Sequence, residues 1–379
     1  MATRSAKTAR KGKGPEGPSY CASPEVPERT FDANVDVNRA ALIRTTSSKW
    51  VNGTVLRYYF FGDTHNDGQW AFRSNGRRFW RTWATPKAAE KTVVRKAFTT
   101  WQDVGIGVKF EEVKSREDAE IRIGFMRGDG AWSYVGRGIL SKGAHERTMN
   151  FGWDLTRRKS EIDTAVHEIG HTLGFPHEHQ NPHAGIVWDE EAVYTSLAKP
   201  PNRWSRSQTH YNIIRKIEPD EVQGSNWDPH SIMHYPFEAG LIKEPERYGE
   251  TGLSPRPGLS QRDRAWVKAL YPPLKKKDYS ELRPFESAKL AIMAGQQRNY
   301  YIKPEITRLY DIRTFGNSDT VMVLFEETAQ GTRYMAGDDD GGEDYNARIQ
   351  TKLFSGGTYI LRIRLYYQHR TAESAVMLW

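Results

Sequence analysis

Hydrophobic and polar positions follow a helical period between residues 160 and 173. Four apolar residues recur three or four positions apart and predict one buried face of a helix: Ile162, Ala165, Ile169 and Leu173. Ser160 followed by Asp163 forms a capping-box pattern that predicts where this helix begins. Gly174 can adopt a left-handed conformation and end it.

The opposite face of the predicted helix carries the chemistry. His167 and His171 lie four positions apart and therefore nearly in line, and His177 follows the glycine turn. Three neutral imidazoles can hold one Zn²⁺ and leave a position open for water, whose pKa zinc lowers to about 7. Glu168 lies beside the histidines and can serve as a general base. A helix with only surface histidines is the alternative, but it does not account for the glutamate, the glycine and the third histidine together.

Other periodic stretches predict a mixed domain around this helix. Alternating or β-branched runs predict strands at 55–61, 108–113, 119–125, 132–136 and 148–152. Thr85 and Pro86 predict the start of a helix with an apolar stripe at Val94, Ala97, Phe98 and Trp101. We expect a loop at 62–76 and a helix-poor region at 184–230. Ser260 and Asp263 predict a second capped helix, which ends near Tyr271.

The last hundred residues change to a strand pattern. Short runs with strand composition come about every ten residues: 300–302, 308–312, 320–325, 348–353, 358–365 and 375–379. Between 358 and 365 apolar and polar residues alternate clearly. This spacing predicts a small all-β sandwich.

Composition adds three limits. The chain has 379 residues, enough for two domains, and no apolar run long enough to span a membrane. Its net charge of +8 comes from scattered lysines and arginines, which favours a solvated basic surface over a specific nucleic-acid site. Cys21 is the only cysteine, so no intrachain disulfide can form. The N-terminus is basic but lacks the apolar core of a secretory signal peptide.

The motif His-Glu-x-x-His-x-x-Gly-x-x-His at 167–177 resembles that of the metzincin zinc peptidases, and His177-Glu178 resembles the astacin family more narrowly. Ser231-Ile-Met-His-Tyr235 is similar to the methionine turn of that family. The resemblance implies an α+β fold, with a twisted mixed sheet and a zinc-binding active-site helix, over roughly residues 40–275. The absence of disulfides is similar to microbial members.

The same resemblance implies roles for further residues. Met233 would form an apolar floor beneath the zinc, and Tyr235 would be a hinged ligand that stabilises the oxyanion. Glu178 would pair with the N-terminus of the mature enzyme, although the family's usual Arg and Asp are replaced here by neighbours such as His179. We expect His179 and His183 to be surface residues and His234 to be structural.

The C-terminal turns resemble bacterial pre-peptidase C-terminal domains. The segments that carry this resemblance are 317–320, 338–342, 346–349 and 356–358. Asp338, Asp339 and Asp340 could hold Ca²⁺ or serve as solvated turn residues, and the sequence leaves both open.

Cys21 lies in a stretch rich in Pro, Gly, Ser and charge that predicts a flexible tail. Some metzincin proenzymes block the metal with a prosegment cysteine, so Cys21 could cap the zinc until the tail is cut. The alternative is a free thiol in the tail.

We therefore expect a zinc endopeptidase acting on proteins or peptides, with a tail at 1–40, a peptidase domain at 41–274 and a β-sandwich at 280–379. A non-catalytic or latent metal-containing protein that binds through its β-sandwich is the alternative. We expect an extracellular location reached without a recognisable signal peptide, with retention in the cytoplasm still open. The sequence does not determine the oligomeric state.

Overall fold

The computed structural model describes most of the chain from Lys49 onward and four residues before it. The described residues are 20–21, 23–24, 49–50, 52–62, 67–72, 76–217, 226–273, 279–293, 296–329, 331–366 and 371–379. Most of the predicted tail and all of residues 274–278, between the two predicted domains, lie outside these ranges.

A five-stranded sheet forms the floor of the first domain. Its order is β4 (Lys109–Glu112), β1 (Val55–Phe60), β5 (Ile121–Gly124), β7 (Met149–Phe151) and β6 (Ala131–Ser133). The first four strands are parallel, and β6 pairs antiparallel with β7 at the edge. All five strands were predicted, within three residues at their ends.

Two helices pack on this sheet. They are α2 (Ala88–Gln102), with the predicted apolar stripe buried, and α3 (Glu161–Thr172). The Trp101 indole nitrogen donates a hydrogen bond of 2.9 Å to the carbonyl of Val166 and so joins α2 to α3.

The predicted start of α2 was wrong, whereas α3 starts where predicted but lacks the predicted capping box. Helix α2 is capped by Lys87 rather than Thr85, whose hydroxyl bonds the Gly62 carbonyl instead. Ser160 is the N-cap residue of α3, as predicted, but its side chain makes no capping hydrogen bond, and the Asp163 carboxylate accepts one from the backbone of Gly258.

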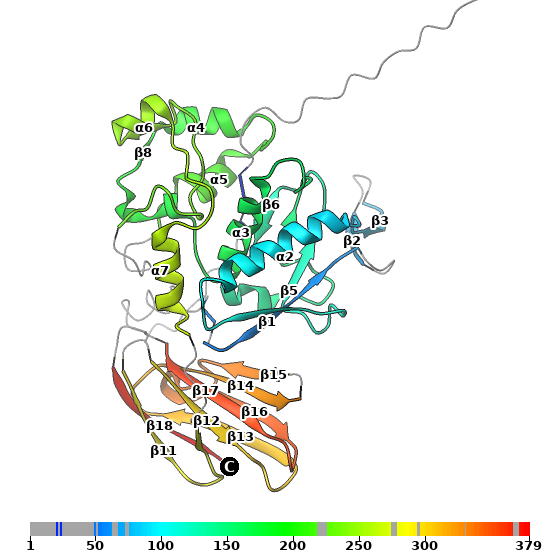
Figure 1. Cartoon of the computed structure of the whole chain (residues 1–379), viewed down its shortest axis with the longest axis vertical. Helices are drawn as coiled ribbons and strands as arrows, with labels where there is room; N and C mark the ends of the chain where they lie inside the picture. The colour runs from blue at the N-terminus through cyan, green and yellow to red at the C-terminus, as the bar shows by residue number, and fades with distance from the viewer. Residues whose placement is uncertain are drawn as a thin grey trace, which may run out of the picture.

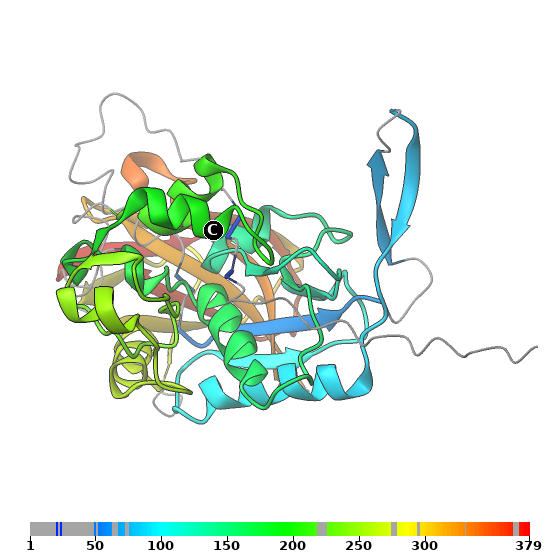
Figure 2. The ribbon, with the colours of Figure 1, turned by 90° about the horizontal axis from the view of Figure 1, so that it is seen from above.

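The segment predicted as a loop at 62–76 contributes to an antiparallel hairpin. Its strands are β2 (Gly68–Phe72) and β3 (Arg78–Thr82), and Figure 2 shows it standing away from the body of the domain. The expectation of a loop was therefore wrong at Gly68–Phe72, which forms the first strand of the hairpin.

A second lobe follows α3 and packs around its own core. Its elements are β8 (Val187–Trp188), α4 (Glu190–Leu197), α5 (Arg206–Thr209), a π-helical turn (His210–Ile214), β9 (Ile242–Glu244) and α6 (Glu246–Thr251). Helix α7 (Gln261–Leu270) follows and packs into the core of the first domain. The expectation of a helix-poor region at 184–230 was therefore wrong between 190 and 214. The capping box of Ser260 and Asp263 at the start of α7 is confirmed.

The C-terminal region is a sandwich of two β-sheets below the first domain (Figure 1). One sheet has β10 (Ser280–Glu281), β12 (Gln297–Ile302), β17 (Tyr359–Leu365), β14 (Thr320–Thr328) and β15 (Gly331–Asp338). The other has β11 (Ala288–Ile292), β18 (Ala372–Leu378), β13 (Arg308–Phe315) and β16 (Arg348–Leu353). The predicted α+β domain followed by a β-sandwich is thus confirmed.

The structure does not support calcium at the aspartate turn. The Asp338 carboxylate accepts hydrogen bonds from the backbone of Gly341 and Arg348, and Asp339 forms an ion pair with Arg137 at 3.1 Å. In the part of the chain that is described, these aspartates do not gather into a cluster of metal ligands. None of the described helices has the length and apolar character needed to cross a bilayer.

Candidate metal centre

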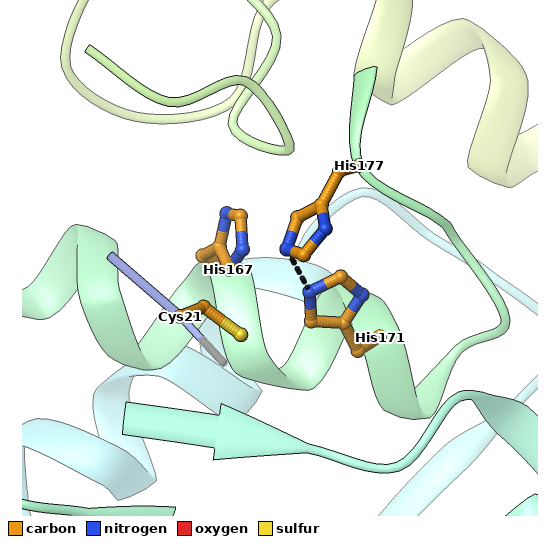
Figure 3. A group of neighbouring side chains, drawn as sticks. All are labelled: Cys21, His167, His171 and His177. Carbon is orange, nitrogen blue, oxygen red and sulfur yellow. Dashed lines mark hydrogen bonds between the residues drawn. The ribbon is translucent and has the colours of Figure 1, made fainter. Parts of the chain in front are cut away.

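Helix α3 brings the predicted histidines together. Ligand atoms of His167, His171 and His177 and the sulfur of Cys21 all lie within 4.8 Å of one another, and all four residues are buried. Figure 3 shows the four side chains converging, with His177 arriving from the segment after the helix. No other group with such geometry occurs among the described residues.

The protein fixes each imidazole through its Nδ1 atom. His167 Nδ1 lies 2.7 Å from the carbonyl oxygen of Ile232, and His171 Nδ1 lies 2.7 Å from that of Phe175. His177 Nδ1 lies 3.3 Å from the side-chain oxygen of Gln180. Because these oxygens only accept, each Nδ1 must carry the proton and each Nε2 must present a lone pair.

The resulting pocket needs a cation. His171 Nε2 and His177 Nε2 lie 3.0 Å apart with lone pairs directed at each other, and His167 Nε2 has no hydrogen-bond partner in the described structure. Burial lowers the pKa of His167 to about 4, and it lowers the pKa values of His171 and His177 well below normal. The imidazoles therefore stay neutral near pH 7, and protonation cannot relieve the repulsion between their facing lone pairs. A divalent cation can, and three imidazole nitrogens are a donor set that fits a borderline-soft ion such as Zn²⁺.

Glu168 borders this pocket from the same helix. Its carboxylate is buried, and Oε2 lies 3.4 Å from the sulfur of Cys21. Burial raises the pKa of Glu168 to about 8, although the hydrogen bond from Cys21 lowers it somewhat. Burial and the nearby Glu168 raise the pKa of the Cys21 thiol.

Tyr235 closes the other side of the pocket. Its hydroxyl lies against His177 Nε2 and donates a hydrogen bond of 2.7 Å to the backbone carbonyl of Cys21. The ring of Tyr20 packs on Tyr235 and on Phe237, and the Tyr20 amide bonds Asn202 at 3.0 Å. The short segment Tyr20–Cys21 is therefore seated in the pocket by side-chain, backbone and ring contacts.

Asp263, which was predicted only as part of a helix cap, also holds the methionine turn. Asp263 caps α7, and it also accepts hydrogen bonds from the Ser231 hydroxyl at 2.6 Å and the Ile232 amide at 2.8 Å. Met233 is buried against α3, where a Cβ on Gly170 would lie only 2.3 Å from its sulfur. The capping pattern in the sequence showed Asp263 but gave no signal for this second contact.

Two further predicted residues lie near the site. Glu178 Oε1 accepts hydrogen bonds from Asn181 at 3.2 Å and the backbone of Asp228 at 2.9 Å, and burial raises the pKa of Glu178 to about 7. Neither of these hydrogen bonds involves the described residues of the tail. His234 is buried and its Nδ1 lies 2.8 Å from the Tyr235 carbonyl, as expected of a structural residue.

One expectation for the neighbouring histidines was wrong. His179 is not a surface residue: it is buried, with Nε2 2.9 Å from the Asn212 carbonyl and its ring near those of His177 and Tyr235. It lies next to the aromatic core of the second lobe, which the local sequence alone did not indicate. His183 is exposed, as expected.

Comparisons with known proteins agree with this geometry. The family model described as Astacin, a peptidase family, matches residues 63–244. Bone morphogenetic protein 1 from Xenopus laevis is 29% identical over 194 residues, which cover 48% of this chain and 24% of that protein. Zinc metalloproteinase nas-26 from Caenorhabditis elegans is 28% identical over 158 residues, which cover 40% of this chain and 34% of that protein. The chain thus spans only about a quarter to a third of the length of these relatives.

Among solved structures, one shorter protein matches this chain over nearly its whole length. The structure of myroilysin is 30% identical in sequence, covers 60% of this chain and 97% of its own, and has a TM-score of 0.50. For the β-sandwich, the pre-peptidase C-terminal domain of a collagenase from Bacillus anthracis is 14% identical with a TM-score of 0.24, too weak a likeness to assign that domain. With the zinc-peptidase motif, the methionine turn and these matches in place, the chain belongs to the astacin family of metallopeptidases.

Proposed function

We propose that the protein is a zinc-dependent endopeptidase whose tail holds it latent. The observation that carries this proposal is the pocket in which three unprotonated Nε2 atoms converge beside a buried carboxylate. His167, His171 and His177 would hold the ion. When bound, zinc supplies a positive charge that polarises a carbonyl group and makes water a nucleophile near neutral pH.

Glu168 is proposed as the general base and acid. Its side chain is fixed on the helix that also presents His167 and His171, within reach of the same pocket. A positive charge nearby favours the carboxylate, which can accept a proton and later release it to the leaving amine.

Tyr235 is proposed to stabilise the oxyanion. In the full chain its hydroxyl donates to the Cys21 carbonyl, an oxygen acceptor of the same kind as a substrate carbonyl. Removal of the tail would free this hydroxyl to donate to the oxygen on which negative charge develops. Met233 and Glu178 are proposed as supports of the site, through the floor beneath α3 and the backbone of Asp228.

Cys21 is proposed as the latency ligand. Its sulfur lies with the three Nε2 atoms and near Glu168, and its carbonyl engages Tyr235, so one residue contacts the proposed ligands, base and oxyanion donor together. A thiolate is a strong zinc ligand, and a bound metal would overcome the burial that keeps the thiol protonated. This supports a zymogen in which substrate cannot enter until residues around 21 are removed.

Activity of full-length and trimmed protein tests the proposal. We expect trimmed protein to cleave casein, chelator to abolish cleavage, and full-length protein to be much less active. Equal activity of the two forms would refute latency, whereas no cleavage by either zinc-loaded form would refute the endopeptidase. We also propose an extracellular location, which detection of the protein in the culture medium of intact cells would test.

A further inference from the structure

The sheet of the β-sandwich that contains β17 turns one face toward the peptidase domain (Figure 1). All seven residues of β17 are buried. Tyr359, Leu361, Ile363 and Leu365 pack in the core of the sandwich. The alternate positions carry Arg362 and Arg364, which a solvent-facing strand would expose but which here are 3% and 4% exposed.

Both arginines bind the chain just before β1. Arg364 Nη2 donates to the Lys49 carbonyl at 3.2 Å, and Arg362 Nη1 donates to the Asn52 carbonyl at 3.0 Å. The Asn52 side chain in turn donates to the carbonyl of Pro272, at the end of α7. The junction is tight, since a Cβ on Gly107 would lie 2.0 Å from Asn52 Oδ1.

The same segment contacts the end of the zinc-binding helix. The indole of Trp50 donates to the Thr172 carbonyl at 2.7 Å, and the Trp50 amide donates to the Tyr271 hydroxyl at 3.2 Å. That hydroxyl donates to the Leu173 carbonyl at 2.6 Å. These carbonyls belong to the last turn of α3, where no helical partner is available, and His171 directly precedes Thr172.

We propose that Arg362 and Arg364 are positioning residues through which the β-sandwich holds the segment at Trp50 against the end of α3 and so fixes the metal-binding imidazole of His171. This inference rests on the proposed zinc site. The C-terminal domain is then a structural part of the metal centre.

The surroundings of the Arg362 and Arg364 charges indicate that these residues position the neighbouring segment rather than stabilise the fold. Among the described residues neither arginine forms an ion pair, and buried donors without a partner remain at Nε of both and at Nη1 of Arg364. Burial lowers the pKa of Arg364 to about 10, so it stays charged at neutral pH. Burying such charges is costly, and apolar replacements of similar size are often neutral or stabilising for folding.

Zinc release from the full chain provides the test. Zinc-loaded Arg364→Met protein is mixed with a chromogenic chelator, and we expect release up to about tenfold faster than from wild type, at the low end of the effect of outer-shell partners. Hydrogen exchange at the Leu173 amide, which donates to Ile169, should also accelerate. Arg298→Met, on an exposed side chain of the same sheet, is the matched control and should change neither rate.

A second variant tests the connection itself. Trp50→Phe removes the hydrogen bond to Thr172 but keeps an aromatic ring, and should accelerate zinc release to a similar extent. The double variant Arg364→Met/Trp50→Phe should release zinc no faster than the faster of the two single variants. Both substitutions interrupt the same chain of contacts from the β-sandwich to α3, so their effects should not add. The proposal would be overturned if folded Arg364→Met protein released zinc and exchanged the Leu173 amide at wild-type rates. It would also be overturned if the two substitutions accelerated zinc release independently, so that their fold-changes multiplied in the double variant. If Arg364→Met protein does not fold, Arg362→Met replaces it, and the same rates are compared for Arg362→Met, Trp50→Phe and their double variant. These readouts need no peptide cleavage, so they are separate from the test of the endopeptidase.

Discussion

The metal pocket on helix α3 and the junction between the two domains are both buried and polar, but they are opposite in character. The metal pocket brings together three Nε2 lone pairs, and lowered pKa values keep its imidazoles neutral. The domain junction holds Lys49, Arg362 and Arg364, and the two arginines donate hydrogen bonds to backbone carbonyls. The metal pocket needs a bound cation to satisfy its lone pairs, whereas the positive charges of the junction are directed at carbonyl oxygens of the same chain. Variants of the pocket should therefore change chemistry, and variants of the junction should change stability or metal retention.

The largest expected effect is that of Glu168→Gln. Loss of the proton acceptor should lower kcat of trimmed protein on a peptide substrate by about 10³-fold, within the range of general-base catalysis, while zinc content stays at wild-type level. Asp163→Asn, on the same helix, keeps an acceptor for Gly258 and should be close to wild type. Substantial turnover in Glu168→Gln would remove this residue from the mechanism.

Tyr235→Phe should have the next largest effect. The variant keeps the ring that packs near His167 and His177 but loses the hydroxyl. We expect kcat of trimmed protein to fall by about 10²-fold with little change in KM, as for removal of one oxyanion donor. Steady-state kinetics decide this, and a change confined to KM would contradict the proposed role.

Cys21→Ser should activate the full chain. A tethered ligand acts at an effective concentration in the millimolar range, so its loss should raise activity by more than about tenfold. The same substitution should have no effect once the tail is trimmed. Ser23→Ala, next to the thiol, is a control that should leave latency intact. Unchanged latency in Cys21→Ser would identify the cysteine as a bystander.

Lys49 should make stability at the junction depend on pH. Burial, with Arg364 nearby, lowers the pKa of Lys49 from 10.5 to about 7. Between pH 7 and 10 the unfolded chain binds the proton that the folded chain has lost, so this group makes stability rise with pH across that window. Lys49→Met should remove this rise and stabilise the protein at pH 6 by a few kcal/mol, on the order expected when the pKa of a lysine falls from 10.5 to about 7. Denaturant unfolding at several pH values measures it, with exposed Lys96→Met as the control.

Gly170→Ala should give the smallest effect. The added Cβ would meet the sulfur of Met233, and such overpacking costs about 1–3 kcal/mol. Gly138→Ala, where nothing lies within 4 Å of the added carbon, should change the free energy of unfolding by less than about 0.5 kcal/mol. Equal stability of the two variants would show that Met233 does not pack closely under the helix.

The zinc-binding helix and its ligand set could be predicted because their signal is local. Spacing alone places His167 and His171 on one face, and the strands and the β-sandwich follow from alternation and composition. The burial of His179 could not be predicted, since it depends on packing against distant segments. The hairpin at 68–82 was missed although its two strands pair locally. The carbonyls of Ile232 and Phe175 that orient the imidazoles leave no mark in the sequence, because any residue supplies a carbonyl.

The junction shows the same limit more clearly. Alternation in β17 correctly identified its core face, yet the same rule would leave Arg362 and Arg364 in solvent. Only the approach of a second domain buries them. Cys21 is an intermediate case: its chemistry suggested a metal ligand, but nothing in its spacing showed that it reaches the histidines.

X-ray absorption at the zinc edge of purified full-length protein tests the proposed metal centre most directly. We predict one zinc per chain, with three nitrogen neighbours and one sulfur at about 2.3 Å, and loss of the sulfur signal in Cys21→Ser. Protein that binds no stoichiometric zinc after incubation with it, or whose zinc lacks imidazole neighbours, would contradict this centre.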